Sequence, residues 1–250
     1  MKAAIRVETI KLVRSPVGMI GSLALILGTL ALLAGITAAL AAGDPALTAK
    51  AGIAAALDWG GLLTAAAQIA SAGGLLGFGV VLSWIFAREF SDGTITGLFA
   101  LPITRARIAL AKLTVYAAWS VAISVALALG TLVLGLTLGY GWPSPDVWAA
   151  FGRQVVLGVL TAVVATPVAW IASIARSLLA AVGGAIALVV IAQVGVLAGA
   201  GGWMPLAAPA LWAISNGTGA DPVQLSLTLA LGVILGVLTC TSWARLQLNR

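Results

Sequence analysis

Long apolar runs dominate this chain. Short segments rich in glycine, proline and charge separate them. A helix that crosses a bilayer needs about 20 mostly apolar residues, and the runs are at least that long. The pattern predicts six spanning helices, at about Val17–Ala42, Gly60–Ala87, Ile108–Tyr140, Val147–Ala175, Leu178–Ala200 and Val223–Trp243. We therefore expect an all-α integral membrane protein whose residues 1–250 form a single transmembrane domain.

The segments between the runs carry residues that end helices. Gly43-Asp44-Pro45, the two prolines of GYGWPSPD and Pro222 each favour a turn. The break between the fourth and fifth runs is much shorter, and Arg176 marks it. An arginine in the middle of the hydrocarbon is costly, so Arg176 belongs at a membrane edge. Pro167 is expected to kink the fourth helix. Such a proline is tolerated in a membrane helix because neighbouring groups can bind the carbonyl that it frees.

Charge is distributed unevenly between the two sets of connections. With the N-terminus inside, the cytoplasmic segments hold eleven Lys and Arg residues, whereas the outer segments hold only Lys50 and Arg153. This asymmetry follows the positive-inside rule, so we expect both termini in the cytoplasm. The outer loops instead carry aspartates, which are Asp44, Asp58, Asp146 and Asp221.

The composition fits a bilayer and excludes several kinds of chemistry. Hydrophobic residues make up 62% of the chain and charged residues 8%, against about a quarter charged in a soluble domain. The chain has no histidine, and Cys240 is its one cysteine, so a general base, a metal set and an intramolecular disulfide are not expected. Ion-driven transporters usually need a charged residue near the middle of a span. No spanning run of this chain has one. Membrane topology explains the net charge of +6, so we expect no nucleic-acid partner.

The first run could also be read as a signal peptide, since an Ala-x-Ala pattern occurs near Ala41. The run is far longer than a signal-peptide core of about 7–15 residues. We therefore expect a retained membrane anchor.

One cytoplasmic connection concentrates charge in an otherwise apolar chain. The segment WIFAREFSDGTITGLFALPITRARIALAKL, Trp84–Leu113, holds Arg88, Glu89, Asp92, Arg105, Arg107 and Lys112. Ser91 and Asp92 are good N-caps for a short helix, and Pro102 would end that helix. Its apolar face would consist of Ile95, Leu98 and Phe99, spaced by three and four residues. Thr104 can cap the helix that follows.

Two interpretations of this segment stay open on pattern alone. It is either an interfacial loop whose charges only satisfy topology, or a docking element whose apolar face enters a groove of a cytoplasmic partner.

The same segment resembles the signature loop of the ABC-transporter type-2 permease family. The matching positions are Glu89, Gly93, Thr94, Leu98, Pro102, Ile103, Thr104, Arg105, Lys112 and Leu113. The head of the chain, VETIKLVRSP, is similar to the N-terminal amphipathic helix of the family, with Glu8, Lys11, Leu12 and Arg14 in place. Gly97 departs from the pattern, because the family more often has a larger residue there.

The resemblance implies a type-2 ABC exporter-like fold, with an interfacial helix in residues 1–16 and a cytoplasmic coupling loop in residues 88–107 that contains a coupling helix between the second and third spans. In such exporters two permease subunits pair with two ATPase subunits, so ATP and magnesium would be bound by the partner ATPase and this chain would need no cofactor. The residues expected to couple to the ATPase are Glu89, Asp92, Gly93, Thr94, Leu98, Phe99, Pro102 and Arg105.

In this family the second and fifth spans line the path between the two permeases. The polar candidates on these spans are Thr64, Gln68, Ser71 and Gln193. Gln68 and Gln193 have an alternative role as hydrogen-bonding links between neighbouring helices. So apolar a lining favours a lipid-like molecule, an amphipathic peptide or a drug as cargo.

Residues 200–222 form a long connection with few charges, and they include Trp203 and Trp212. Tryptophan favours the membrane interface. Two short half-inserted helices on the outer side would fit this segment, and an ordinary loop anchored by its tryptophans is the alternative.

These features favour the permease subunit of an ABC exporter. It would be non-catalytic, homodimeric or paired with a related permease, and located as a multi-pass protein in a bacterial cytoplasmic membrane. The alternative is a non-transporting scaffold or immunity protein that binds a partner. A membrane-embedded enzyme ranks third, because the catalytic residue types are absent.

Overall fold

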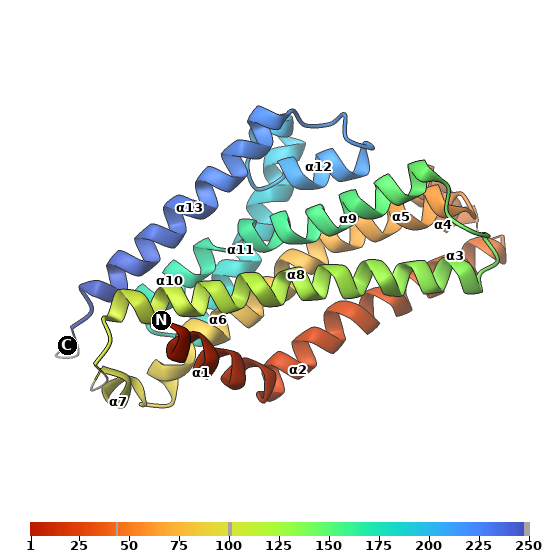
Figure 1. The fold of residues 1–250 in the computed structure, drawn as a ribbon. Coiled ribbons are helices and arrows are strands. Elements are labelled where there is room, and N and C mark those ends of the chain that lie inside the picture. Colours follow the sequence, from red (N-terminus) through yellow and green to blue (C-terminus); the bar gives the residue numbers. More distant parts are fainter. Residues whose placement is uncertain (44, 100–101, 248–250) are drawn as a thin grey trace.

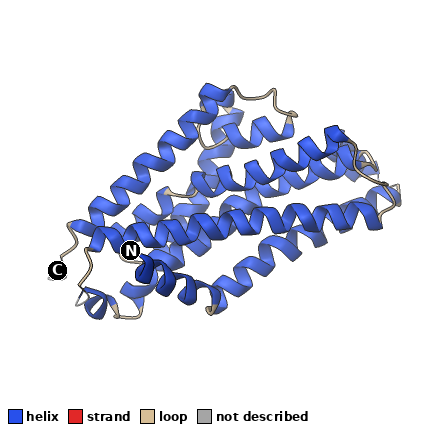
Figure 2. Cartoon of the chain, viewed as in Figure 1, coloured by secondary structure: helices blue, strands red, loops and turns tan. Residues whose placement is uncertain are grey.

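A computed structural model describes residues 1–43, 45–99 and 102–247. Over these residues the chain forms helices and turns, without a strand (Figure 2). The helices that are long and apolar enough to cross a membrane are Pro16–Ala41, Trp59–Ser91, Arg105–Thr137, Pro145–Ala175, Leu178–Leu197 and Pro222–Ala244. The predicted all-α fold with six spans is therefore confirmed.

Three of the spans contain more than one helical segment. The first consists of α2 (Pro16–Leu23), the π-helical turn η1 (Ala24–Gly28) and α3 (Thr29–Ala41). The second consists of α5 (Trp59–Ile69), the π-helical turn η3 (Ala70–Gly74) and α6 (Leu75–Ser91). The fourth consists of α9 (Pro145–Val164) and α10 (Pro167–Ala175).

The other three spans are single helices, namely α8 (Arg105–Thr137), α11 (Leu178–Leu197) and α13 (Pro222–Ala244). The shorter elements are α1 (Lys2–Val13), α4 (Pro45–Ala51), η2 (Gly52–Ala55), α7 (Ile95–Phe99), η4 (Gly201–Trp203) and α12 (Ala208–Ile214).

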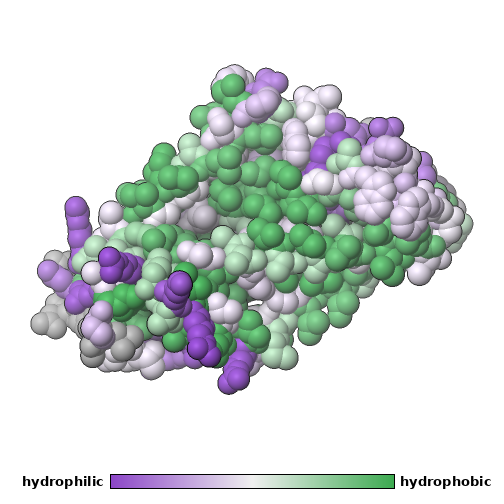
Figure 3. Space-filling model, viewed as in Figure 1, coloured by the Kyte–Doolittle hydropathy of each residue, from purple (hydrophilic) through white to green (hydrophobic). Residues whose placement is uncertain are grey.

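The two ends of the helix bundle differ in what they hold (Figure 1). One end, which we call the terminal end, holds α1, α7 and the last turn of α13, with the N-terminus nearby. The opposite end, which we call the far end, holds α4, the start of α5 and the connection from α8 to α9. The hydrophilic side chains in Figure 3 gather at these two ends, and a hydrophobic surface lies between them.

Local sequence signals explain where most of the helices begin. Ser15 caps α2 by accepting a hydrogen bond from the backbone N–H of Gly18 at 2.8 Å, and Asp58 caps α5 by accepting one from Gly61 at 2.8 Å. Prolines stand in the first turn of α2, α9, α10 and α13, where the missing N–H removes no helical hydrogen bond. These capping groups are short-range, so the sequence predicts them well.

The predicted interruption of the fourth span and the predicted break between the fourth and fifth spans are also present. The fourth span is interrupted between Val164 and Pro167. Arg176 adopts a left-handed backbone conformation, with φ of 51°, and ends α10. Ser177 then caps α11 by accepting a hydrogen bond from the N–H of Ala180 at 3.4 Å.

In the 200–222 segment, the structure has the short 3₁₀ turn η4 and the seven-residue helix α12. α12 packs against α5, α9 and α13, which explains why this segment is helical rather than an open loop. Its insertion into the membrane stays a prediction, as does the interfacial position of α1.

Small side chains let the spans approach one another closely. Seven alanines of the main core are fully buried, and they are Ala87, Ala109, Ala165, Ala169, Ala172, Ala181 and Ala185. One such close approach joins α6 to α11, where a Cβ built on Gly79 would lie 2.6 Å from the Cβ of Ala185. Such close contact is typical of membrane helices, which associate through packing of small residues.

Candidate functional site

Four charged side chains from three helices meet at the terminal end, and we call them the ion cluster. They are Glu8 and Lys11 of α1, Glu89 of α6 and Lys112 of α8. The ammonium group of Lys112 is the centre. Its Nζ donates to Glu89 Oε1 at 2.7 Å, to Glu8 Oε2 at 3.0 Å and to the carbonyl of Ile85 at 2.8 Å. All three donor positions of this lysine therefore have acceptors.

Lys11 completes the ion cluster from the partly exposed side. Its Nζ donates to Glu8 Oε1 at 2.7 Å and to Glu89 Oε1 at 3.1 Å. Burial disfavours the charged form of Lys11, but the hydrogen bond to Glu8 and the charge of Glu89 outweigh it and raise the pKa of Lys11. Two carboxylates and two ammonium groups thus neutralise one another.

Because the ion cluster is buried, removing any one of its buried charges lowers the stability of the protein. Lys112 is 1% exposed and Glu89 is 2% exposed. Removing one partner of a buried pair leaves an uncompensated charge, which costs about 3–5 kcal/mol. The ion cluster therefore fastens α1 to α6 and α8 more firmly than surface ion pairs could.

Two aromatic rings, those of Phe86 and Trp243, lie beside the ion cluster. The Nζ of Lys112 lies 5.8 Å from the ring centroid of Trp243 and 6.0 Å from that of Phe86. Trp243 is fully buried, and its Nε1 donates to Ser173 Oγ at 2.8 Å. The last span and α10 are thereby joined to the same corner of the bundle.

The connection after α6 differs from the prediction at its start. Ser91 is the last residue of α6 and Asp92 is its C-cap, so the expectation that these residues cap the next helix is wrong. Gly93 follows with φ of +67°, a conformation that glycine adopts without steric cost. The N–H of Asp92 donates to the carbonyl of Arg88, and that of Gly93 to the carbonyl of Phe90. Gly93 is therefore the residue that ends α6.

Helix α7 follows, anchored by its apolar residues. Ile95 is buried and Leu98 is half-buried, and both pack against the main core. Phe99 is the last residue of α7, but its side chain lies outside the described part, as do Ala100 and Leu101. After the gap, Thr104 occupies the N-cap position of α8 without a side-chain hydrogen bond.

The residues after α13 form hydrogen bonds with the start of α8 and the end of α10. Arg105 donates to the carbonyl of Leu246, and Arg176 donates to the carbonyl of Gln247 at 2.8 Å. Leu246 is itself buried. The start of α8 and the end of α10 are therefore both tied to the residues after α13.

The predicted coupling residues differ in exposure, and Leu98 and Arg105 are half-buried. Glu89 lies inside the protein, where it cannot form a surface contact. Asp92, Gly93, Thr94 and Pro102 are exposed around α7. Glu8, Lys11 and Lys112 were not among the predicted coupling residues, although opposite charges in adjoining apolar helices were a signal that they pair.

The predicted path residues lie on α5, η3 and α11. Thr64 and Ser71 donate to backbone carbonyls of their own span, those of Gly60 and Gln68, each at 2.8 Å. The side chains of Gln68 and Gln193 are exposed. In residues 1–43, 45–99 and 102–247, neither amide side chain forms a hydrogen bond. Both the predicted path role of these amides and the alternative that they link neighbouring helices therefore stay predictions.

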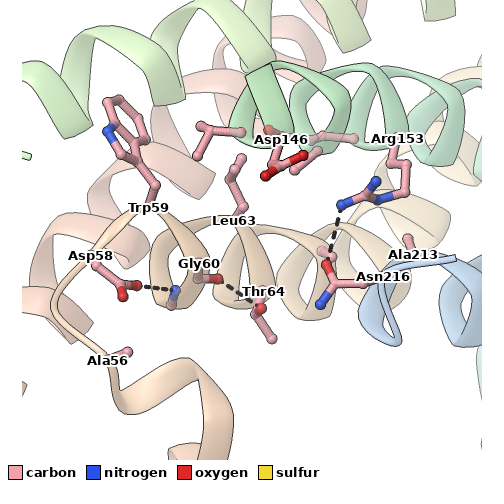
Figure 4. Close-up of a pocket in the computed structure, with 15 residues that line it drawn as sticks. Ala56, Asp58, Trp59, Gly60, Leu63, Thr64, Asp146, Arg153, Ala213 and Asn216 are labelled. Carbon is pink, nitrogen blue, oxygen red and sulfur yellow. Dashed lines mark hydrogen bonds between the residues drawn. The ribbon is translucent and has the colours of Figure 1, made fainter. Parts of the chain in front are cut away.

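A separate cavity of about 420 Å³ lies at the far end, between α5, α9 and the end of α12, and we call it the far-end pocket (Figure 4). Asp58, Thr64, Asp146, Arg153 and Asn216 are among the residues that line it. Arg153 Nη2 donates to Asn216 Oδ1 at 3.2 Å. Of the predicted path residues, Thr64 is the one that this cavity includes.

Comparison with known proteins identifies the fold that carries these sites. The sequence profile of the ABC-2 family transporter proteins matches residues 4–194, which is more than half of the chain and includes the ion cluster and α7. A search of curated proteins finds no match. Permeases of this family work in general with an ABC ATPase. The matched region and the six apolar spans show that this multi-pass membrane protein belongs to the ABC-2 transporter family.

Proposed function

We propose that this chain is the non-catalytic permease subunit of an ABC exporter, and that the exposed residues around α7 receive the motion of a separate ATPase. The cargo would be an amphipathic or hydrophobic molecule, such as a drug, a peptide or a lipid-like compound. Two ATPase subunits would bind ATP and magnesium, and a second copy of this chain or a related permease would complete the transporter. The ion cluster is the observation that carries this proposal.

The ion cluster makes α7 part of a rigid corner. α7 lies between α6 and α8 in the chain, and Glu89 near the end of α6 pairs with Lys112, which lies about two turns into α8. Glu8 and Lys11 add α1 to the same unit. A force applied at α7 would therefore move α1, α6 and α8 together, because separating them exposes unpaired charge in an apolar medium.

The charged residues beside α7 form only a weak ion pair with each other, so they can pair with charges of another protein instead. The pair between Arg88 Nε and Asp92 Oδ2 is 3.3 Å long and both side chains are substantially exposed. Such a pair contributes about 0–1 kcal/mol. Asp92 would thus be free to pair with a cation of the ATPase at little cost.

The charge distribution supports a cytoplasmic position for this surface. The terminal end carries ten of the described Lys and Arg residues, and the far end carries Lys50 and Arg153. By the positive-inside rule the terminal end faces the cytoplasm, where an ATPase has access to ATP. A bacterial cytoplasmic membrane is the setting we propose.

The test is co-purification with the cognate ABC ATPase in mild detergent. We compare wild type with Asp92→Lys, which reverses charge beside α7, and with Asp146→Lys, which makes the same change at the far end. A lysine near the C-terminus of α6 suits the helix dipole, so Asp92→Lys should leave the fold intact. We expect wild type and Asp146→Lys to retain a stoichiometric ATPase, and Asp92→Lys to lose it or to uncouple ATP hydrolysis.

Two results would contradict the proposal. If wild type retains no ATPase, a non-transporting scaffold or immunity protein becomes the better hypothesis. If Asp92→Lys and Asp146→Lys retain and stimulate the ATPase equally, the coupling surface lies elsewhere.

A further inference from the structure

The far-end pocket has the size and composition of a ligand site. Its volume of about 420 Å³ lies within the roughly 300–1,000 Å³ that is typical of pockets for small molecules. Apolar residues from three elements form part of its wall, among them Leu63 of α5, Val147 and Ala150 of α9, and Ala213 of α12. The polar groups stand among them rather than in a separate patch (Figure 4).

The charges in the far-end pocket do not cancel. Asp58 and Asp146 contribute two carboxylates and Arg153 contributes one guanidinium. Among the described residues, none of the three forms an ion pair. Asp58 accepts the helix-capping bond from Gly61, and Arg153 is engaged with Asn216. The wall therefore carries one net negative charge beside apolar surface.

Two buried polar atoms of the wall also lack partners. Gln154 is 5% exposed and its Nε2 donates to Thr131 Oγ1 at 3.2 Å, which leaves Oε1 as the unpaired atom. In the described part of the chain, Gln154 Oε1 and Trp59 Nε1 are buried without a hydrogen bond. Buried polar groups of this kind are normally satisfied. Of the two, the Gln154 oxygen is an acceptor, which favours positive charge nearby, whereas the Trp59 N–H is a donor and gives a cation no support.

We propose that the far-end pocket binds an organic monocation, meaning a positively charged centre carried on an apolar body. One positive charge would cancel the net charge of the wall. Asp146 would lie opposite that charge, and the carbonyl oxygen of Gln154 would add the negative end of a dipole. Leu63, Val147 and Ala150 would contact the apolar body. Arg153 would repel a second positive charge, which limits the ligand to one.

This site includes Thr64 of the predicted path, but it can be tested separately from the proposed transport function. Its wall comes from α5, α9 and α12 of one chain, whereas the path expected from the family lies between the second and fifth spans of two chains. Binding can therefore be measured without an ATPase, and it holds whether or not the bound cation is the cargo.

The experiment uses two probes of the same shape and opposite charge. Purified full-length protein in a non-ionic detergent is titrated with radiolabelled tetraphenylphosphonium and, separately, with tetraphenylborate, and protein-free micelles give the partition background. We expect saturable binding of the phosphonium and only background partition of the borate. Saturable borate binding, or phosphonium binding no greater than background, would overturn the proposal.

Substitutions then locate the site. Asp146→Asn removes one charge at nearly constant volume and should weaken phosphonium binding about tenfold, because the bound cation loses the attraction of a nearby carboxylate. Asp58→Asn should act in the same direction, because asparagine caps a helix as well as aspartate does. Asp92→Asn at the terminal end is the matched control and should leave binding unchanged.

Filling the cavity provides a second, independent readout. Ala150→Phe adds a ring to the apolar wall and should abolish saturable binding of the phosphonium while the protein keeps its elution volume in size-exclusion chromatography. If Ala150→Phe does not fold, the comparison of Asp146→Asn with Asp92→Asn still decides. Equal affinity in that pair would show that the cation binds elsewhere.

Discussion

Lys112 shows most clearly how single side chains organise this protein. A lysine is almost never fully buried unless it is paired, and Lys112 is 1% exposed with two carboxylates and one carbonyl around it. The pair of Arg88 and Asp92 has similar chemistry but lies at the surface. Both are pairs of a cationic side chain and a carboxylate, so their expected contributions to stability differ because one pair is buried and the other is exposed.

We expect Lys112→Met to destabilise the protein strongly. Methionine fits the length of the lysine stem but leaves the carboxylate of Glu89 with only Lys11 as a cationic partner, at a cost of about 3 kcal/mol. Arg88→Met is the matched control and should cost at most about 1 kcal/mol. The free energy of unfolding, measured by detergent titration of both variants against wild type, checks this. Equal losses would mean that the ion cluster contributes no more than a surface pair.

At the same scale, the sequence shows which residues carry charge but not which of them meet. Lys112 and Glu8 are 104 residues apart in the chain, and Lys112 and Glu89 are 23 apart. Their contact depends on how α1, α6 and α8 pack, which no local pattern contains. Gly93 was predictable as a special position, whereas the burial of Glu89 was not.

At the scale of helices, starts were easier to predict than ends. Serine, aspartate and proline at the helix starts act on backbone groups a few residues away. The end of α6 was misplaced because Phe90 continues its buried face, and its ring lies 6.0 Å from that of Trp243. This tertiary contact extends α6 to Ser91, so that Asp92 is the C-cap of α6 instead of the N-cap of the next helix.

The close packing of α6 on α11 gives a second prediction. Gly79→Ala would place a methyl group 2.6 Å from the Cβ of Ala185, so the two helices would have to separate, at a cost of about 1–3 kcal/mol. Gly97→Ala is the control, because a Cβ on Gly97 meets nothing within 4 Å. Thermal denaturation followed by size-exclusion chromatography should show a lower midpoint for Gly79→Ala and an unchanged or higher one for Gly97→Ala. A lower midpoint in both variants would contradict the packing argument.

At the scale of the whole molecule, the six spans were predictable because apolar length is a property of the sequence itself. The far-end pocket was not, since it exists only where α5, α9 and α12 converge. Asp58, Asp146 and Arg153 were visible as outer charges, but their common cavity follows from packing. The sidedness of the molecule belongs to the same scale, and it decides whether an ATPase can reach α7.

Sidedness can be tested with one cysteine at each end of the bundle. Cys240→Ala removes the native thiol, and Thr94→Cys or Trp142→Cys is then added at an exposed position of the terminal or the far end. In intact cells, a membrane-impermeant maleimide should label the Trp142→Cys variant, because the positive-inside rule places the far end outside. The Thr94→Cys variant should be labelled only after the membrane is permeabilised. The opposite result would put α7 outside the cell, where no ATPase could drive it, and the proposed function would then be wrong even if the ion cluster is intact.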